Sequence, residues 1–310
     1  MTELYKSRNF GDLISDTFSF IRQHGKHYFQ TYFTVNGAFL LVMAILMYFF
    51  SKIYTDFIFF SIQNPGMQPA FMENYSTWIW GGIFGFFLFI FVTIIHHAFP
   101  VIYFRYFEID PEKKFGAREI AISLRSYLSK IVAFFVMSIF AVLLPAIIVF
   151  TILVLLSMFL IGIPMLMIAI PVFFTWVQQS LFHYLNTEDT YFTSLGEGWN
   201  VTFKNFWPNI GSCLTMHILM QVILGIFGMI IYVVGAFLVM MEMNNSGDPE
   251  ALFPMLQVII SIVFIFSTLS SLILNNLIFI NQAMIYYSHR EKTENINSFK
   301  TIDSIGQSFE

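Results

Sequence analysis

Three pairs of neighbouring polar residues interrupt long apolar stretches of this chain: His96-His97, Gln178-Gln179 and Asn281-Gln282. Each pair lies near one end of its stretch and is followed by aromatic residues and a polar segment. These six side chains, here called the polar layer, both donate and accept hydrogen bonds. One ring of them would suit a lipid headgroup or the backbone of a partner protein. The alternative is hydrogen bonding that fixes helix packing, at about 0.6 kcal/mol per contact. The sequence favours packing and leaves both interpretations open.

The adjacent histidines do not make a metal site on their own. Consecutive helical residues point about 100° apart, whereas two ligands on one helix are expected four residues apart. No Asp or Glu lies inside the apolar stretches to complete a ligand set, and their absence also argues against ion-coupled transport. The chain shows no phosphate-binding glycine loop and no nucleophile elbow. We therefore predict no catalytic residue, no metal and no cofactor.

Three further polar residues lie deeper in the apolar stretches, namely His217, Asn275 and Asn276. Polar groups within a membrane usually face the interior of the helix bundle. We expect these three to be buried between helices. So few polar groups would make a poor path for ions.

The apolar stretches themselves define the class of protein. The chain is 57% hydrophobic and 11% charged, and no charged residue occurs between positions 131 and 185. About 20 apolar residues in a helix cross the roughly 30 Å hydrocarbon core of a bilayer. We therefore predict an all-α integral membrane protein. A hairpin is expected at Gly162 and Pro164, and kinks at Pro145 and Pro171. The breaks in the apolar pattern give six spans: 31–50, 78–103, 131–159, 163–184, 210–240 and 253–287.

The distribution of lysine and arginine predicts the orientation. With six spans, fourteen of the fifteen basic residues fall at one set of helix ends, and Lys52 alone falls at the other. Cytoplasmic loops carry the excess of Lys and Arg. Both termini are therefore expected in the cytoplasm. The fourteen are Lys6, Arg8, Arg22, Lys26, Arg105, Lys113, Lys114, Arg118, Arg125, Lys130, Lys204, Arg290, Lys292 and Lys300.

A short amphipathic pattern precedes the first, third and fifth spans. Aligning Gly11 with Gly196 places Thr17 on Thr202, and the segment from position 115 offers a weaker third copy. We predict a repeated unit, an interfacial amphipathic helix followed by a transmembrane hairpin, against the alternative of chance similarity between apolar sequences. The repeats are 7–107, 112–186 and 190–290 within one membrane domain, 1–290, and 291–310 is expected to be a disordered cytoplasmic tail. The apolar face of the first copy is expected to lie in the cytoplasmic interface of the membrane, with packing against the helix bundle as the alternative. It consists of Phe10, Leu13, Ile14, Thr17, Phe18, Ile21 and Gly25.

The first amphipathic segment also carries a family resemblance. Phe10-Gly-Asp-Leu-Ile, continuing to Thr17-Phe18 and leading into a six-span, Phe-rich bundle, resembles the membrane domain fused to some bacterial glycerophosphodiester phosphodiesterases, and its stand-alone relatives. The resemblance implies a multi-pass protein of the bacterial inner membrane. The hydrolase domain with its metal ligands is absent, so hydrolase activity does not carry over.

These observations together predict a non-enzymatic scaffold or accessory of a membrane or envelope system that contacts lipid. The alternative is a carrier or flippase for a lipid or another uncharged amphipathic molecule. The expected partners are membrane lipids and another membrane or envelope protein, and no nucleic acid.

Overall fold

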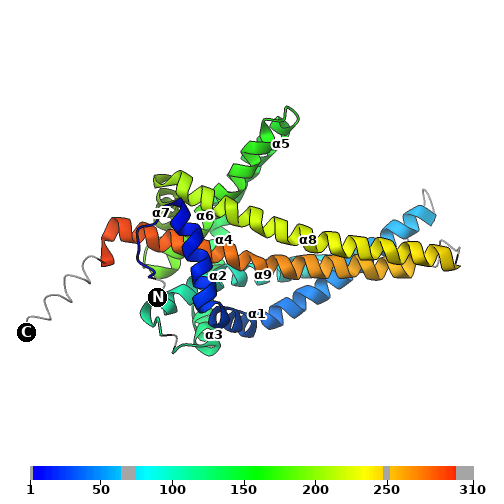
Figure 1. Cartoon of the computed structure of the whole chain (residues 1–310), viewed down its shortest axis with the longest axis horizontal. Helices are drawn as coiled ribbons and strands as arrows, with labels where there is room; N and C mark the ends of the chain where they lie inside the picture. The colour runs from blue at the N-terminus through cyan, green and yellow to red at the C-terminus, as the bar shows by residue number, and fades with distance from the viewer. Residues whose placement is uncertain (1–2, 64–74, 113, 247–251, 298–310) are drawn as a thin grey trace, which may run out of the picture. The chain divides into compact units, whose positions relative to one another are not determined.

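A computed structural model describes residues 3–63, 75–112, 114–246 and 252–297 of the chain, and every regular element within these ranges is a helix (Figure 1). Six helical segments are long and apolar enough to cross a membrane: Phe10–Gln63, Trp80–Ile109, Leu128–Ser157, Gly162–Asn186, Phe206–Asn244 and Leu252–Glu294. The prediction of an all-α chain with six candidate membrane-spanning helices is confirmed. The helices are α1 (Phe10–Gln63), α2 (Tyr75–Ile109), α3 (Ala117–Ser126), α4 (Leu128–Ser138), α5 (Leu144–Ser157), α6 (Gly162–Asn186), α7 (Tyr191–Lys204), α8 (Phe206–Ser246) and α9 (Leu252–Glu294).

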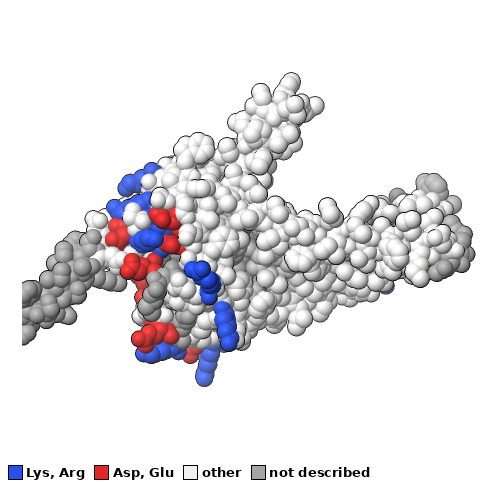
Figure 2. All heavy atoms as spheres, in the orientation of Figure 1, with Lys and Arg blue, Asp and Glu red and all other residues white. Residues whose placement is uncertain are grey.

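The chain forms two compact units. Unit 1 comprises Met1–Val35, Ile94–Leu219 and Asn276–Glu310, and unit 2 comprises Asn36–Thr93 and Met220–Asn275. The twelve members of the predicted cytoplasmic set that the structure describes all belong to unit 1, and Lys52 belongs to unit 2. Figure 2 shows most of the visible charged side chains gathered over one part of the face, with the rest of that face almost free of them. The charge asymmetry of the sequence thus coincides with a division of the fold.

Helix α1 differs from the expected separate interfacial helix. The structure continues one helix from Phe10 to Gln63 instead of ending it near Gly25. No proline lies in this segment, and one glycine inside a helix costs only about 1 kcal/mol. The amphipathic segment and the first span are therefore one element.

The buried face of this segment coincides only in part with the predicted apolar face. Phe10 and Phe18 of that face are each 44% exposed, whereas Phe20, which the predicted face omits, is fully buried. The Phe20 ring contacts the rings of Phe104 and Phe107 in α2, with centroids 4.9 and 5.4 Å away. Two apolar stripes overlap on this helix, and the contacts with α2 select the one that contains Phe20. The buried stripe is Leu13, Thr17, Phe20, His24, Gly25 and Tyr28.

The predicted hairpin after the third span lies where Gly162 indicated. Helix α5 ends at Ser157 and α6 begins at Gly162. The predicted kink at Pro145 takes the form of a π-helical turn, Ile139–Leu143, directly before it. Proline lacks the N–H group that would bond the preceding turn, and a π-helical turn accommodates this local change.

Unit 2 contains the parts of α1 and α2 within Asn36–Thr93 and the parts of α8 and α9 within Met220–Asn275. The Ser51 and Ser261 hydroxyls lie 2.7 Å apart and join α1 to α9. The rings of Phe227 and Phe266 lie 5.7 Å apart between α8 and α9, which run side by side (Figure 1). Apolar contact with a few hydroxyl bonds holds this unit together.

The predicted tail begins later than expected. Helix α9 continues through position 291 to Glu294, and Arg290 donates two hydrogen bonds, of 3.0 and 2.8 Å, to the Glu294 carboxylate. An ion pair four residues apart stabilises a helix end. Residues 298–310, the rest of the predicted tail, lie outside the described residues.

Candidate functional site

Members of the predicted polar layer meet inside unit 1. The first contact joins α2 to α6: the His97 ring Nδ1 donates to Gln178 Oε1 at 3.0 Å, and the Gln178 amide donates to the His97 carbonyl at 3.3 Å. The second joins α6 to α9: the Gln179 amide donates to both the main-chain and the side-chain oxygen of Gln282, at 2.9 Å each. The Gln282 amide then donates to Thr175 Oγ1 at 3.1 Å. These bonds connect three membrane helices.

The two remaining members of the layer have other partners. Asn281 donates to Thr17 Oγ1 of α1 at 3.2 Å and accepts from Ser212 of α8 at 3.3 Å. The Nδ1 atom of His96 lies 3.3 Å from the Tyr32 hydroxyl. The six side chains thus bond in separate groups. A single ring of His97, Gln179 and Gln282 is not among the described bonds, because His97 pairs with Gln178, and a binding role for such a ring stays a prediction.

The deeper polar residues differ in their surroundings. Asn276 is fully buried, and its side-chain oxygen accepts a 2.8 Å hydrogen bond from Tyr28. His217 Nδ1 lies 2.9 Å from the Cys213 carbonyl of its own helix, and its ring packs against Phe174. Asn275 is half-buried. Within the described residues, no three or more His, Cys, Asp or Glu side chains form a group that could hold a metal ion.

A charged cluster in unit 1 was missed by the sequence reasoning. Tyr5 and Tyr287 both donate to the carboxylate of Glu108 at the end of α2, the latter at 3.0 Å. Arg290 donates to the Tyr5 hydroxyl at 2.7 Å and lies 3.7 Å from Glu108. Burial, followed by the hydrogen bond to Glu108, raises the pKa of Tyr5 far above its ordinary value. These contacts join residues more than 100 positions apart, so no local sequence pattern could predict them.

The N-terminal segment is held by a second buried contact. Arg8 Nε donates to Asp16 at 2.9 Å, and its NH1 donates to the Leu4 carbonyl at 2.7 Å. The main-chain N–H of Arg8 donates to Ser288 of α9 at 2.9 Å, and Lys292 donates to the Arg8 carbonyl at 2.8 Å. Desolvation lowers the pKa of Arg8, and Asp16 opposes that change. The segment before α1 is thereby bound to the end of α9.

Helix α7 packs closely on α6. The Thr190 side chain accepts from the main-chain N–H of Thr193 and caps the helix. A Cβ atom added at Gly198 would lie 2.6 Å from the main-chain nitrogen of Ser180, so only glycine allows this approach. The Trp176 indole N–H donates to the Leu195 carbonyl at 2.9 Å. These contacts set which face of α7 remains exposed.

The exposed face of α7 carries aromatic rings. The rings of Trp176 and Trp199 have centroids 5.1 Å apart, and those of Trp199 and Phe203 are stacked at 4.0 Å. Phe203 contacts Phe206, which contacts Trp207 at the start of α8. We call these five residues the aromatic strip. Trp199 is 46% and Trp207 70% exposed.

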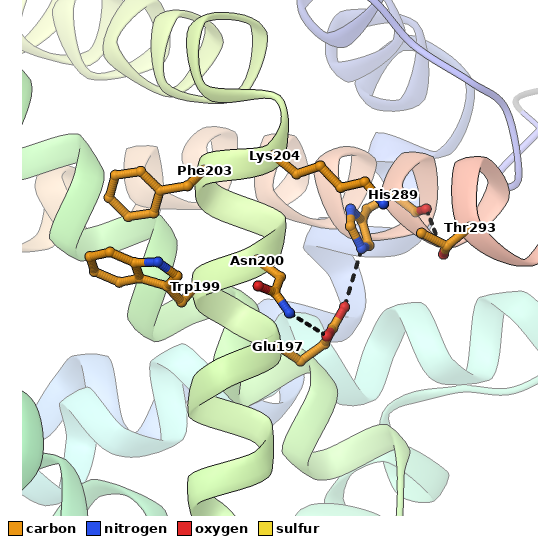
Figure 3. A pocket seen from close by; sticks show the side chains of 7 residues that line it. All are labelled: Glu197, Trp199, Asn200, Phe203, Lys204, His289 and Thr293. Atoms are coloured by element: carbon orange, nitrogen blue, oxygen red, sulfur yellow. Dashed lines mark hydrogen bonds and ion pairs between the residues drawn. The ribbon is translucent and has the colours of Figure 1, made fainter.

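A pocket of about 650 Å³ borders the aromatic strip between α7 and the end of α9. In Figure 3 the Glu197 carboxylate lies between His289 and Asn200, which contact its two oxygens at 3.2 and 3.1 Å. Lys204 extends toward His289, and the described residues include no ion-pair partner for it. The pocket therefore places a fixed carboxylate, an ammonium group and aromatic rings together. It is lined by Glu197, Trp199, Asn200, Phe203, Lys204, His289 and Thr293.

Neither family models, nor curated proteins, nor solved structures give a match to this chain. The likeness to the phosphodiesterase-linked membrane domain therefore stays a prediction that rests on the segment beginning at Phe10.

Proposed function

We propose that the protein is a non-enzymatic, multi-pass scaffold or accessory of the bacterial inner membrane, which contacts lipid through its interfacial helices. The observation that carries this proposal is the aromatic strip beside the pocket of Glu197 and Lys204. Tryptophan is enriched where a membrane meets water, because its ring is apolar and its N–H is polar. A carboxylate and an ammonium group beside such rings match the opposite charges of a zwitterionic lipid headgroup.

The polar layer supports a scaffold in preference to a carrier. Gln179, Asn281 and Gln282 are fully buried. Their amide groups bond to other protein groups across α1, α6, α8 and α9. Hydrogen bonds of this kind fix how membrane helices pack. Opening a path through this level would break several of them at once.

One feature of unit 2 favours the carrier as a second candidate. A groove of about 410 Å³ lies between α1 and α2, and its lining is almost entirely apolar. Gly81 and Gly82 form one wall, with no other group within 4 Å of an added Cβ, and Phe49 and Phe50 belong to the opposite wall. The groove has the shape and chemistry to receive an acyl chain.

The proposal includes an orientation with both termini in the cytoplasm. Its support is that the twelve described members of the predicted cytoplasmic set all lie in unit 1. Positive residues are retained on the cytoplasmic side of bacterial membranes. The proposed family relation and three-fold repeat are consistent with this orientation, since α3 and α7 each precede a candidate span.

Reporter fusions test the orientation. Fusions after Met67 and Gly247 are expected to report the periplasm, and fusions after Lys114 and Glu197 the cytoplasm. Alkaline phosphatase is active only outside the cytoplasm, and a fluorescent protein in parallel reports the opposite side. A cytoplasmic signal from the Gly247 fusion would contradict the six-span orientation and the repeat with it.

Purification from native membranes, combined with reconstitution, tests the function. A scaffold is expected to retain one or a few companion proteins in near-stoichiometric amounts, measured by quantitative mass spectrometry against an unrelated multi-pass control. In vesicles that contain a fluorescent phospholipid, a scaffold should not move lipid between leaflets. The label in the inner leaflet should then stay protected from dithionite. Rapid loss of that protected label would identify a carrier instead. If the protein retained no companion proteins and moved no lipid, both functions would be contradicted.

A further inference from the structure

The turn between α5 and α6 is apolar at every position. Its four residues, Met158, Phe159, Leu160 and Ile161, are between 63% and 81% exposed. No charged residue lies between Lys130 and Glu188. The other two loops predicted on the far side of the membrane contain Glu73, and Asp248 with Glu250, respectively. This hairpin alone has no charged group at its tip to hold it in water.

Three backbone N–H groups of the turn donate hydrogen bonds within the hairpin. The N–H groups of Met158, Phe159 and Leu160 donate to carbonyls three residues earlier, at 3.2, 3.0 and 2.9 Å. Hydrocarbon tolerates irregular backbone only where its polar groups have protein partners. Three N–H groups of the turn therefore have the protein partners that a membrane interior requires.

Leu160 occupies a position that normally suits glycine. Its φ angle is 62°, in the left-handed region, which costs an ordinary residue about 1–2 kcal/mol. Two residues later, a Cβ added at Gly162 would lie 2.2 Å from the Leu153 carbonyl oxygen, so only glycine fits this close approach of α6 to α5. A leucine at the strained position covers the turn with hydrocarbon, which glycine would not do.

The hairpin is also short when measured from the polar layer. Gln178 and Gln179 are the members of the polar layer on α6. From Gln178 to Leu160 the chain covers about 18 residues, or about 27 Å, less than the roughly 30 Å hydrocarbon core.

We propose that the tip of the α5–α6 hairpin, Ser157–Gly162, ends inside the hydrocarbon of the leaflet remote from the polar layer and contacts acyl chains there. The hairpin enters and leaves on the same side, so the proposal does not depend on the scaffold function or on the orientation of the termini. Its surface suits lipid, because all four exposed side chains of the turn are apolar and the N–H groups of Met158, Phe159 and Leu160 are bonded.

Site-directed labelling tests the position of the tip. Cys213, the only cysteine, is replaced by serine, and single cysteines are placed as Phe159→Cys at the tip and Asn244→Cys at the exposed end of α8. A maleimide is added to the protein in native membranes. Its reaction needs the thiolate, so the Phe159→Cys thiol is expected to react at least about tenfold more slowly than the Asn244→Cys thiol.

A nitroxide on the same two cysteines identifies what surrounds them. At Phe159→Cys, oxygen dissolved in the bilayer should relax the probe strongly and a water-soluble nickel chelate weakly, with the reverse at Asn244→Cys. Met158→Cys serves as a second tip variant, and size-exclusion profiles confirm that each variant is folded. Equal maleimide rates, or strong relaxation by nickel at the tip, would place the turn in water and overturn the proposal. Protection from both relaxants would also overturn it, because a protein partner and not lipid would then cover the tip.

Discussion

Gly198→Ala is expected to destabilise the protein by about 1–3 kcal/mol, in line with the cost of overpacking a filled interior. The added Cβ atom would lie 2.0 Å from Ser180 Oγ and 2.6 Å from the Ser180 main-chain nitrogen. The hydroxyl can rotate, but the backbone of α6 cannot move without disturbing its bonds to α2 and α9 through Gln178 and Gln179. Helix α7 must therefore shift away from α6. Thermal unfolding in detergent and protease cleavage near Asp189 measure the effect.

Gly196→Ala is the matched control. It lies two residues earlier on the same helix, is exposed, and has no other group within 4 Å of an added Cβ. Alanine is favoured over glycine in a helix by about 1 kcal/mol, so this variant should be as stable as the wild type or slightly more stable. Equal melting temperatures for the two variants would show that α7 does not rest on Ser180.

Arg8→Met is expected to cost about 3 kcal/mol, the lower end of the range for removing one partner of a buried ion pair. The Arg8 side chain is completely buried, and its guanidinium bonds to Asp16 and to the Leu4 carbonyl. Without it, the Asp16 carboxylate loses its buried partner, and Lys6, at 3.2 Å, is its remaining ion-pair partner among the described residues. The N-terminal segment should then detach from α9, which exposes positions 3–9 to proteolysis.

Lys6→Met provides the comparison, because Lys6 contacts the same carboxylate from a side chain that is 42% exposed. Exposed ion pairs contribute at most about 1 kcal/mol. Asp16→Asn combined with Arg8→Met should recover part of the loss, and a double-mutant cycle measures the coupling. If Lys6→Met were as damaging as Arg8→Met, the buried guanidinium would not be the group that holds the segment.

The sequence by itself determined that the chain is helical and long enough to cross a membrane six times. Apolar stretches without charge leave the backbone no partner but itself, and helices satisfy that condition locally. It also determined the division of basic residues, with Lys52 apart from the other fourteen, because the positions of charges follow from the chain order of the spans. Both properties arise from neighbours in sequence.

Only the tertiary structure decided which surfaces and partners are used. Helical periodicity alone allows either Phe18 or Phe20 to be buried. Contact with the rings of α2 buries Phe20. Composition does not distinguish Gly196 from Gly198, and the position of α6 does. His97 bonds to Gln178, and not to Gln179 as the predicted ring required. Each outcome depends on contacts between helices far apart in the chain, and the 3.6-residue period constrains the face of a helix without specifying what that face will meet.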